Sequence, residues 1–175
     1  METVEILTGS GERTGSIVSR NEVHGKGLWH GTVHIWIRDI NGDLLFQKRA
    51  LSKKSHPGLW DISCAGHISA GDTSCGAAVR EMMEELGIKA DTQYLRPLFT
   101  VKQQYINSDN TLIDNEITDV YLYGVPIRLQ EILVDAGEVA GICFFPSNIL
   151  KSSKLKDRKT FVQHDEEYVQ LSDIL

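Results

Sequence analysis

The sequence lacks several features that would restrict its location or its partners. No apolar run approaches the roughly 20 residues of a membrane-spanning helix. The N-terminal segment METVEILTGSGERTG starts acidic and does not have the basic-then-apolar order of a signal peptide. The three cysteines are odd in number and show no CxxC spacing, which argues against a disulfide framework. We therefore expect a cytoplasmic protein with no membrane partner.

The charge balance argues against nucleic acid as a partner. The chain has 18 lysines and arginines against 24 aspartates and glutamates, a formal net charge of -6 at pH 7, whereas nucleic-acid-binding domains are usually basic. A small phosphorylated molecule held by a local basic patch or by metal ions is still compatible with this charge. The 175 residues are 41% hydrophobic and contain no internal repeat, so we predict one domain over residues 1–175.

Apolar runs and turn residues predict several strands. VEILTG is a first strand, and residues 32–50 are typical of a hairpin, because Asn41-Gly42 accepts the positive φ angles of a tight turn. Residues 58–68 are β-like, and GICFFP is a further short strand. A second hairpin is predicted from residues 94–106 and 115–127, and the tail from Ser147 is predicted to be mostly helical.

One strong helix separates these strands along the chain. Thr73 or Ser74 can cap its N-terminus, the apolar spacing continues to about Leu86, and Gly87 is suited to the position after its end. Strands before and after one helix predict an α+β fold, with helices packed on a mixed sheet.

Three glutamates crowd one face of this helix. Glu81 and Glu85 are four residues apart, and Glu84 is three residues from Glu81, so the carboxylates project from neighbouring positions. Like charges at this spacing repel by roughly a few tenths of a kcal/mol per pair. Mg²⁺ or Mn²⁺, which prefer carboxylate oxygens, would offset the repulsion. The alternative is a solvated helix face with an Arg80–Glu84 ion pair.

Residues 66–88 resemble the Nudix box, G-x5-E-x7-R-E-U-x-E-E-x-G-U, where U is a bulky apolar residue. The chain fills every fixed spacing and departs only at Asp72, which replaces the first glutamate. The resemblance implies the Nudix fold, a mixed β-sheet sandwiched by helices (α/β/α), and metal-dependent cleavage of a diphosphate bond. It implies Glu81, Glu84 and Glu85 as metal ligands, Arg80 as the residue that orients them, and catalytic roles for Arg80, Glu84 and Glu85.

Residues 34–67 are similar to the isopentenyl-diphosphate isomerase branch of the same superfamily. In that branch an RALSKK..PG.W segment supplies cations to the substrate diphosphate, which implies substrate binding by Arg49, Lys53 and Lys54, with Trp60 able to stack on a base or cover a prenyl chain. The isomerases also hold one metal with two N-terminal histidines, the histidine after the box glycine, and an E-x-E pair. The corresponding positions in this chain are His24, His30, His67, Asp114 and Glu116, with an aspartate replacing the first glutamate of the pair.

From this resemblance we take His67 and Glu116 as further metal ligands, and Glu116 also as a catalytic residue. The alternative is that His24, His30 and His67 are ordinary polar loop residues. His34 is interpreted as a sheet-facing side chain rather than a ligand, and His56 as a solvated residue of the basic loop.

One position separates hydrolase from isomerase. The isomerase needs a cysteine immediately before the Gly66-His67 pair, and this chain has Ala65 there; Cys64 is one residue early, which on a strand points it to the opposite face. Isomerases also tend to lose most of the box glutamates, whereas this chain keeps the three on the helix, Glu81, Glu84 and Glu85. We therefore predict a Nudix pyrophosphohydrolase acting on a nucleoside diphosphate derivative or a prenyl diphosphate.

Two other functions are kept as alternatives. The first is an isopentenyl-diphosphate delta-isomerase, and the second is a non-catalytic nucleotide-binding module, which the Asp72 departure motivates. The expected partner is a small-molecule diphosphate, and a homodimer is compatible with the sequence.

Overall fold

The computed structural model describes residues 2–107, 109 and 112–175. The strands are β1 (Thr3–Leu7), β2 (Arg13–Ser19), β3 (Trp29–Ile37), β4 (Leu44–Arg49), β5 (Trp60–Asp61), β6 (Cys64–His67), β7 (Leu95–Ile106), β8 (Ile113–Tyr123) and β9 (Val139–Phe145). The α-helices are α1 (Arg20–Lys26), α2 (Ser74–Leu86) and α3 (Asp165–Ile174). Short 3-10 helices are η1 (Thr92–Tyr94), η2 (Leu129–Glu131), η3 (Ser147–Lys151) and η4 (Ser153–Lys156).

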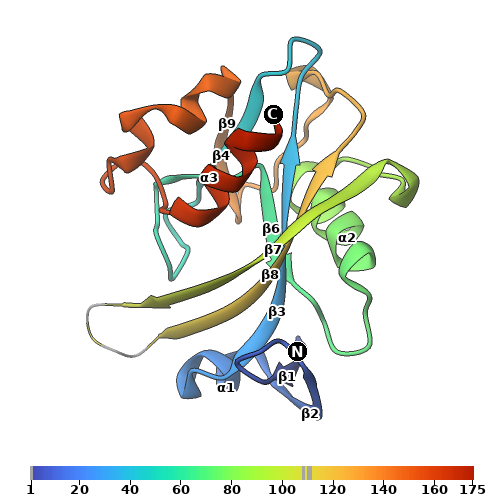
Figure 1. Cartoon of the computed structure of the whole chain (residues 1–175), viewed down its shortest axis with the longest axis vertical. Coiled ribbons are helices and arrows are strands. Elements are labelled where there is room, and N and C mark those ends of the chain that lie inside the picture. Colours follow the sequence, from blue (N-terminus) through green and yellow to red (C-terminus); the bar gives the residue numbers. More distant parts are fainter. Residues whose placement is uncertain (1, 108, 110–111) are drawn as a thin grey trace.

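A mixed six-stranded sheet forms the centre of the molecule, in the order β2-β1-β3-β8-β7, with β6 also paired to β3. Strands β3 and β8 run parallel, from the pair Trp29–Asn115 to the pair Ile37–Tyr123, and the other pairings are antiparallel. Strand β3 lies at the middle of this sheet (Figure 1). Its side chains alternate between the two faces of the sheet.

The predicted hairpin over residues 32–50 is wrong. The chain does turn at Asn41-Gly42, where Gly42 has φ +85° and its N–H donates to the Asp39 carbonyl at 3.1 Å. After the turn, however, β4 joins a separate three-stranded sheet, β5-β4-β9. Its backbone meets the residue after β3 in the isolated bridge Arg38–Leu44, while side chains of the two strands still pack together, as Trp36 does on Phe46. The β-like segment 58–68 is also divided, since β5 belongs to the small sheet and β6 to the central one.

Two hydrophobic clusters lie on opposite faces of the central sheet. On one face, Val33 and Ile35 of β3 pack with Ala78, Met82 and other buried residues of α2. On the other face, Trp36 packs with a cluster that includes Phe46, Tyr168 and Leu171. The alternation of side chains along β3 thus divides the core between α2 and α3. The expected α+β sandwich is confirmed, with the two helices on opposite sides of the sheet (Figure 1).

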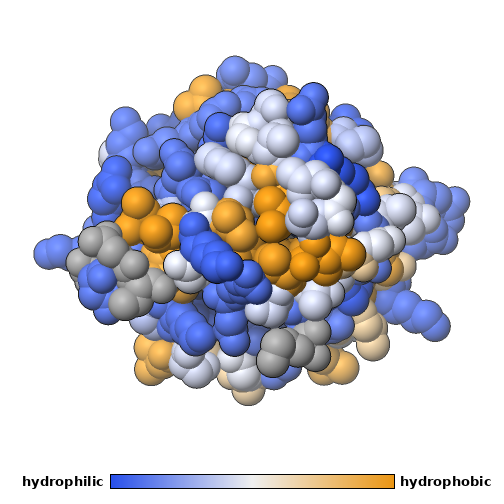
Figure 2. Space-filling view, turned by 90° about the horizontal axis from the view of Figure 1, so that it is seen from below, coloured by the Kyte–Doolittle hydropathy of each residue, from blue (hydrophilic) through white to orange (hydrophobic). Residues whose placement is uncertain are grey.

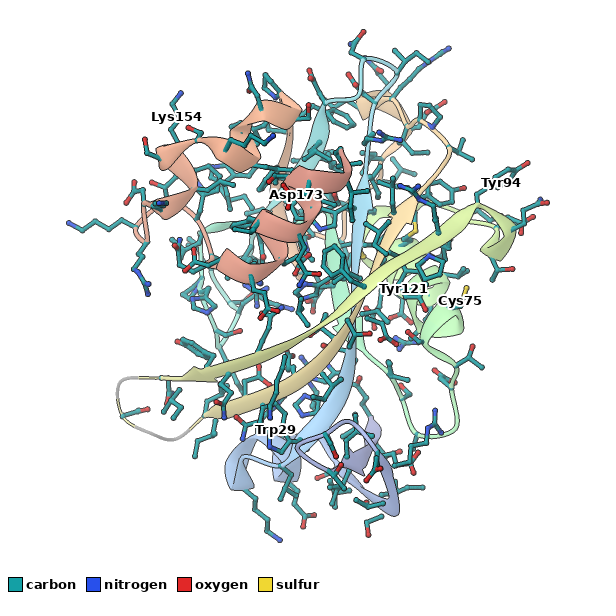
Figure 3. The ribbon with its side chains drawn as sticks, viewed as in Figure 1. Trp29, Cys75, Tyr94, Tyr121, Lys154 and Asp173 are labelled. Atoms are coloured by element: carbon teal, nitrogen blue, oxygen red, sulfur yellow. The ribbon has the colours of Figure 1, made fainter. Side chains whose placement is uncertain are left out.

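The strong helix and the second hairpin are confirmed. Helix α2 begins after Thr73, whose hydroxyl accepts from the Gly76 N–H at 3.0 Å, and ends before Gly87 at φ +64°. Strands β7 and β8 pair antiparallel. Tyr121 of β8 reaches α2 from the sheet, where its hydroxyl donates to Ser74 at 2.9 Å (Figure 3). The sequence interpretation did not find β2 or α1, and the tail contains extended residues between η4 and α3.

The end of the molecule near β1, β2 and α1 is mostly hydrophilic, with a band of hydrophobic residues across it (Figure 2). Within the described ranges, no helix is both long enough and apolar enough to cross a membrane. The three cysteines are free thiols, as the absence of a disulfide pattern predicted.

Candidate active site

A cavity of about 590 Å³ lies beside β3. Residues of α1, β3, β6 and β8 contribute to its lining, together with residues from the ranges 49–59 and 158–164. Six of the predicted site residues belong to this lining: Arg49, Lys53, Lys54, His67, Glu85 and Glu116. Four others, Arg80, Glu81, Glu84 and Trp60, do not line it.

Arg80 links the predicted metal ligands of α2 to the strand before the helix. Its Nη1 donates to Glu81 at 2.6 Å and to Glu84 at 3.1 Å, and its Nη2 donates to the His67 carbonyl at 2.8 Å. Asp72 lies 3.7 Å from Arg80 Nε, so the residue that departs from the box pattern still contacts the guanidinium. This arrangement fixes the position of Glu81 and Glu84 relative to β6.

Glu81 packs directly against Gly66. A Cβ at Gly66 would stand 2.0 Å from Glu81 Cδ and 2.2 Å from Oε1, so only glycine leaves room for this carboxylate. Burial raises the pKa of Glu81 to about 7, and the charge of Arg80 opposes this shift while Glu85 adds to it. The box glycine is therefore required by close packing of the Glu81 side chain.

Glu85 lies one helical turn further and is buried. It accepts a hydrogen bond from Gln47 Nε2 at 3.1 Å, and the Ala65 backbone N–H approaches it at 3.5 Å. Burial raises the pKa of Glu85, and the Gln47 hydrogen bond offsets part of that rise. Among the three glutamates of α2, Glu85 alone belongs to the lining of the cavity.

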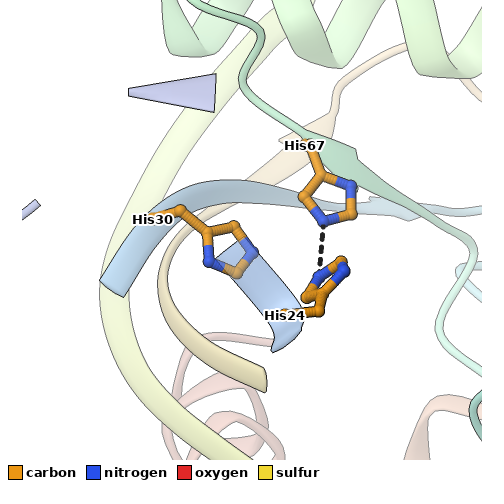
Figure 4. Close-up of side chains that lie close together, drawn as sticks. All are labelled: His24, His30 and His67. Carbon is orange, nitrogen blue, oxygen red and sulfur yellow. Dashed lines mark hydrogen bonds between the residues drawn. The ribbon is translucent and has the colours of Figure 1, made fainter. Parts of the chain in front are cut away.

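Three histidines from separate elements meet at one place (Figure 4). His24 of α1 and His67 of β6 face one another with their Nε2 atoms 3.3 Å apart, and His30 of β3 stacks on His67 with ring centroids 5.1 Å apart. Burial lowers the pKa of both His30 and His67, which favours neutral rings. The chain thus brings together the three histidines that the isomerase resemblance singled out.

Two carboxylates of β8 complete this cluster. Asp114 Oδ1 lies 3.3 Å from His24 Nε2 and 3.5 Å from His30 Nε2, and Glu116 Oε1 lies 4.0 Å from His30 Nε2. Burial, and then the charge of Asp114, raise the pKa of Glu116 to about 8. Within the described residues, His30 Nε2 and Asp114 Oδ1 are buried and have no hydrogen-bond partner. We call these five residues, His24, His30, His67, Asp114 and Glu116, the histidine–carboxylate cluster.

The basic residues after β4 lie at the same cavity. Arg49 donates to Asp61 at 2.8 Å and to the Ser55 carbonyl and hydroxyl at 3.0 and 2.9 Å, and Lys53 pairs with Glu138. Lys54 is exposed at the cavity. Trp60 instead packs edge to face on Phe145, with centroids 5.6 Å apart, so the geometry gives no support for its predicted contact with substrate.

The interpretation of His56 as solvated is wrong. It is half-buried, lines the cavity and packs on Tyr105 with ring centroids 4.3 Å apart. Its backbone has φ +49°, uncommon for a residue with a side chain.

Sequence reasoning missed a second set of polar residues at the cavity. His34 is sheet-facing as predicted, but its Nδ1 lies 2.7 Å from Glu167 Oε2, and both residues are buried. His164 contacts Asp61 Oδ1 at 2.8 Å through Nε2. The partners of each pair are more than 100 positions apart, so no local spacing in the sequence could have indicated them.

Comparison with known proteins gives the family. A NUDIX domain profile matches residues 28–167, most of the chain. The chain belongs to the NUDIX family. Nudix hydrolase 3 of Arabidopsis thaliana is 40% identical over 179 residues, which cover 99% of this chain and 23% of that protein. An isopentenyl-diphosphate Delta-isomerase of Serratia proteamaculans is 36% identical over 122 residues, which cover 70% of this chain and 66% of the isomerase.

This Nudix chain therefore spans about a quarter of the plant relative and about two thirds of the bacterial one. A crystal structure from Deinococcus radiodurans superimposes with a TM-score of 0.70 at 19% identity, covering 98% of this chain and 99% of the other. The resemblance to the Nudix superfamily and its isomerase-like branch is confirmed, and so is the fold.

Proposed function

We propose that this Nudix chain is a divalent-metal-dependent pyrophosphohydrolase that cleaves a diphosphate bond in a small phosphorylated metabolite. The observation that carries the proposal is that one cavity is lined by Glu85, by four members of the histidine–carboxylate cluster (all but His30) and by the cationic residues Arg49, Lys53 and Lys54. Carboxylates and neutral imidazoles are ligands for divalent cations, and the basic residues suit the phosphates.

The residues present fit bound cations. Buried polar atoms are nearly always hydrogen-bonded, so unpartnered His30 Nε2 and Asp114 Oδ1, 3.5 Å apart, are suited to a shared ligand. Glu81 and Glu85 are buried acids whose raised pKa values would fall on contact with a cation. Mg²⁺ or Mn²⁺ bound here would neutralise charge on the diphosphate and lower the pKa of an attacking water.

The predicted site residues divide between metal binding, positioning and phosphate binding. Glu81, Glu84 and Glu85 hold metal, and Arg80 keeps the first two in position through its three hydrogen bonds. Glu116 and His67 add ligands from the histidine–carboxylate cluster, and Glu116, which lines the cavity, is also placed to act on the reacting groups as a catalytic residue. Arg49, Lys53 and Lys54 supply positive charge for the substrate phosphates at the cavity.

An isomerase acting on isopentenyl diphosphate is the second candidate, because the histidine–carboxylate cluster assembles as the isomerase resemblance implies. The residue before the Gly66-His67 pair argues against the isomerase. Ala65 lines the cavity, whereas Cys64 is fully buried in the cluster beneath α2, and burial raises its pKa well above the usual value. The thiol that an isomerase needs at this position is therefore absent from the cavity lining.

Product analysis distinguishes the two candidates. The protein is incubated with isopentenyl diphosphate, ADP and a nucleoside diphosphate sugar, each with Mg²⁺, with Mn²⁺ and with EDTA. Release of phosphate or monophosphate only with metal is expected. Dimethylallyl diphosphate appearing without phosphate release would establish the isomerase instead, and ligand binding without turnover under any metal would establish a binding module.

A further inference from the structure

His34 is held rigidly at the edge of the cavity by a residue from the far end of the chain. Its Nδ1 lies 2.7 Å from Glu167 Oε2, and Glu167 Oε1 accepts a hydrogen bond from Trp36 Nε1, also at 2.7 Å. Glu167 is 1% exposed, so it is inaccessible to substrate. His34 itself lines the cavity, and among the described residues no hydrogen bond uses its Nε2.

A second histidine lies beside it. His164 has its Nε2 2.8 Å from Asp61 Oδ1 and its Nδ1 3.0 Å from Gln103 Oε1, and its ring centroid is 5.0 Å from that of His34. Both nitrogens of His164 are therefore occupied within the protein. Of the four ring nitrogens of His34 and His164, Nε2 of His34 is therefore the one available to bind a ligand.

The groups around His34 determine its pKa, and with it whether Nε2 donates or accepts a hydrogen bond. Glu167 and His164 of the C-terminal segment contact His34 directly, and the charges of Asp61 (β5) and Arg49 (β4) also act on it. Burial alone would lower the pKa of His34, but the charge and hydrogen bond of Glu167 more than offset it and raise the pKa above 6.5. Nε2 is a donor in the protonated ring and an acceptor in the neutral one, so it needs a polar partner in either state.

We propose that His34, positioned by Glu167, determines specificity by hydrogen-bonding a hydroxyl group on the organic part of the substrate. The inference rests on the proposed diphosphate hydrolase function. His30 and His34 lie on the same face of β3, four residues and thus roughly 13 Å apart. A diphosphate near the histidine–carboxylate cluster would leave His34 for the group attached to it. Phe161 and Val162, which also line the cavity, offer apolar contact for a carbon skeleton.

A prenyl chain has no group that could hydrogen-bond to Nε2. Covering this nitrogen with hydrocarbon would leave a buried polar group unpaired, which is costly. Sites that hydrogen-bond a substrate hydroxyl discriminate strongly against analogues that lack it. We expect kcat/KM for a hydroxyl-bearing diphosphate to exceed that for isopentenyl diphosphate by about 100-fold or more.

The test compares UDP-glucose and ADP with isopentenyl diphosphate for the wild type and three variants. H34L removes the hydrogen-bonding nitrogen, H34Q keeps a polar group at that place, and E167Q leaves His34 but weakens its support. E166Q is the matched control, because Glu166 is the exposed neighbour of Glu167 on α3. Circular dichroism and thermal melting check that each variant is folded.

H34L is expected to lower kcat/KM for UDP-glucose and ADP by about 100-fold while leaving isopentenyl diphosphate nearly unchanged. H34Q should recover most of the loss, E167Q should fall between the two, and E166Q should match the wild type. Equal losses on all three substrates in folded H34L, or a wild-type preference for isopentenyl diphosphate, would overturn the inference.

A binding measurement separates this inference from the proposed function. Calorimetry with UDP-glucose and isopentenyl diphosphate in EDTA reads the contact with His34 without turnover. If no diphosphate is cleaved under any condition, yet H34L weakens only UDP-glucose binding, the proposed function fails and the His34 contact stands. Cleavage of diphosphates with no effect of H34L on either rate or binding would overturn the contact alone.

Discussion

Gly66→Ala is the smallest change that should remove a predicted metal ligand from its place. The new Cβ would stand 2.0 Å from Glu81 Cδ, 2.2 Å from Oε1 and 2.3 Å from Cγ. Because carbon contacts normally measure about 3.5–4.0 Å, the carboxyl group must move by about 1.5–2 Å. Misplacement of about 1 Å can cost on the order of 100-fold in rate, and we expect at least that loss in metal-dependent turnover.

The same clash should lower stability. Overpacking typically costs about 1–3 kcal/mol, which urea unfolding would measure. Gly141→Ala is the matched control, since nothing lies within 4 Å of a Cβ there and Gly141 is a strand residue without a positive φ. The double variant Gly66→Ala/Glu81→Ala removes the clashing side chain, so its stability should recover while its activity stays low. Wild-type stability and turnover in Gly66→Ala would refute this reasoning.

Two further predictions concern the charged residues around the cavity. Glu167→Gln should lower the free energy of unfolding by on the order of 3 kcal/mol near pH 6, because it breaks a buried ion pair. Because the pKa of His34 is raised in the folded protein, the stabilisation by the His34–Glu167 pair is complete below the unfolded pKa of about 6.5 and is lost as pH rises through the folded pKa. Urea unfolding at several pH values should therefore show that the loss of stability in Glu167→Gln shrinks as pH rises. A loss of stability independent of pH would contradict this. Lys53→Ala should raise KM for a diphosphate about 10-fold with little change in kcat. Lys154→Ala should leave both unchanged, because Lys154 is exposed on η4 (Figure 3) and does not belong to the cavity lining. Equal effects of the two variants would argue against phosphate binding by Lys53.

The local features of this chain could be predicted because they are encoded within a few residues. Thr73 caps the N-terminus of α2 and Gly87 its C-terminus, as their residue types predict. The shared face of its glutamates follows from the helical repeat. The sequence also indicated that Ala65 and Cys64 point to opposite faces, and the structure has Ala65 at the cavity and Cys64 in the core.

The long-range arrangement could not be predicted in the same way. The turn at Asn41-Gly42 is typical of a hairpin, but burial of both apolar runs sends β3 and β4 into different sheets. His34 has the alternation of an ordinary strand residue, and its partner Glu167 arrives from α3, 133 positions away. Pairings of this kind depend on the packing of the C-terminal segment against the sheet.

The central claim is that carboxylates of α2 hold a metal that drives diphosphate cleavage. The most direct test is the rate of monophosphate release from UDP-glucose by the wild type and by Glu85→Gln, each with Mg²⁺ and with EDTA. We expect turnover by the wild type only with metal, and a loss of at least about 100-fold in Glu85→Gln. Turnover in EDTA, or a Glu85→Gln rate equal to that of the wild type, would contradict it.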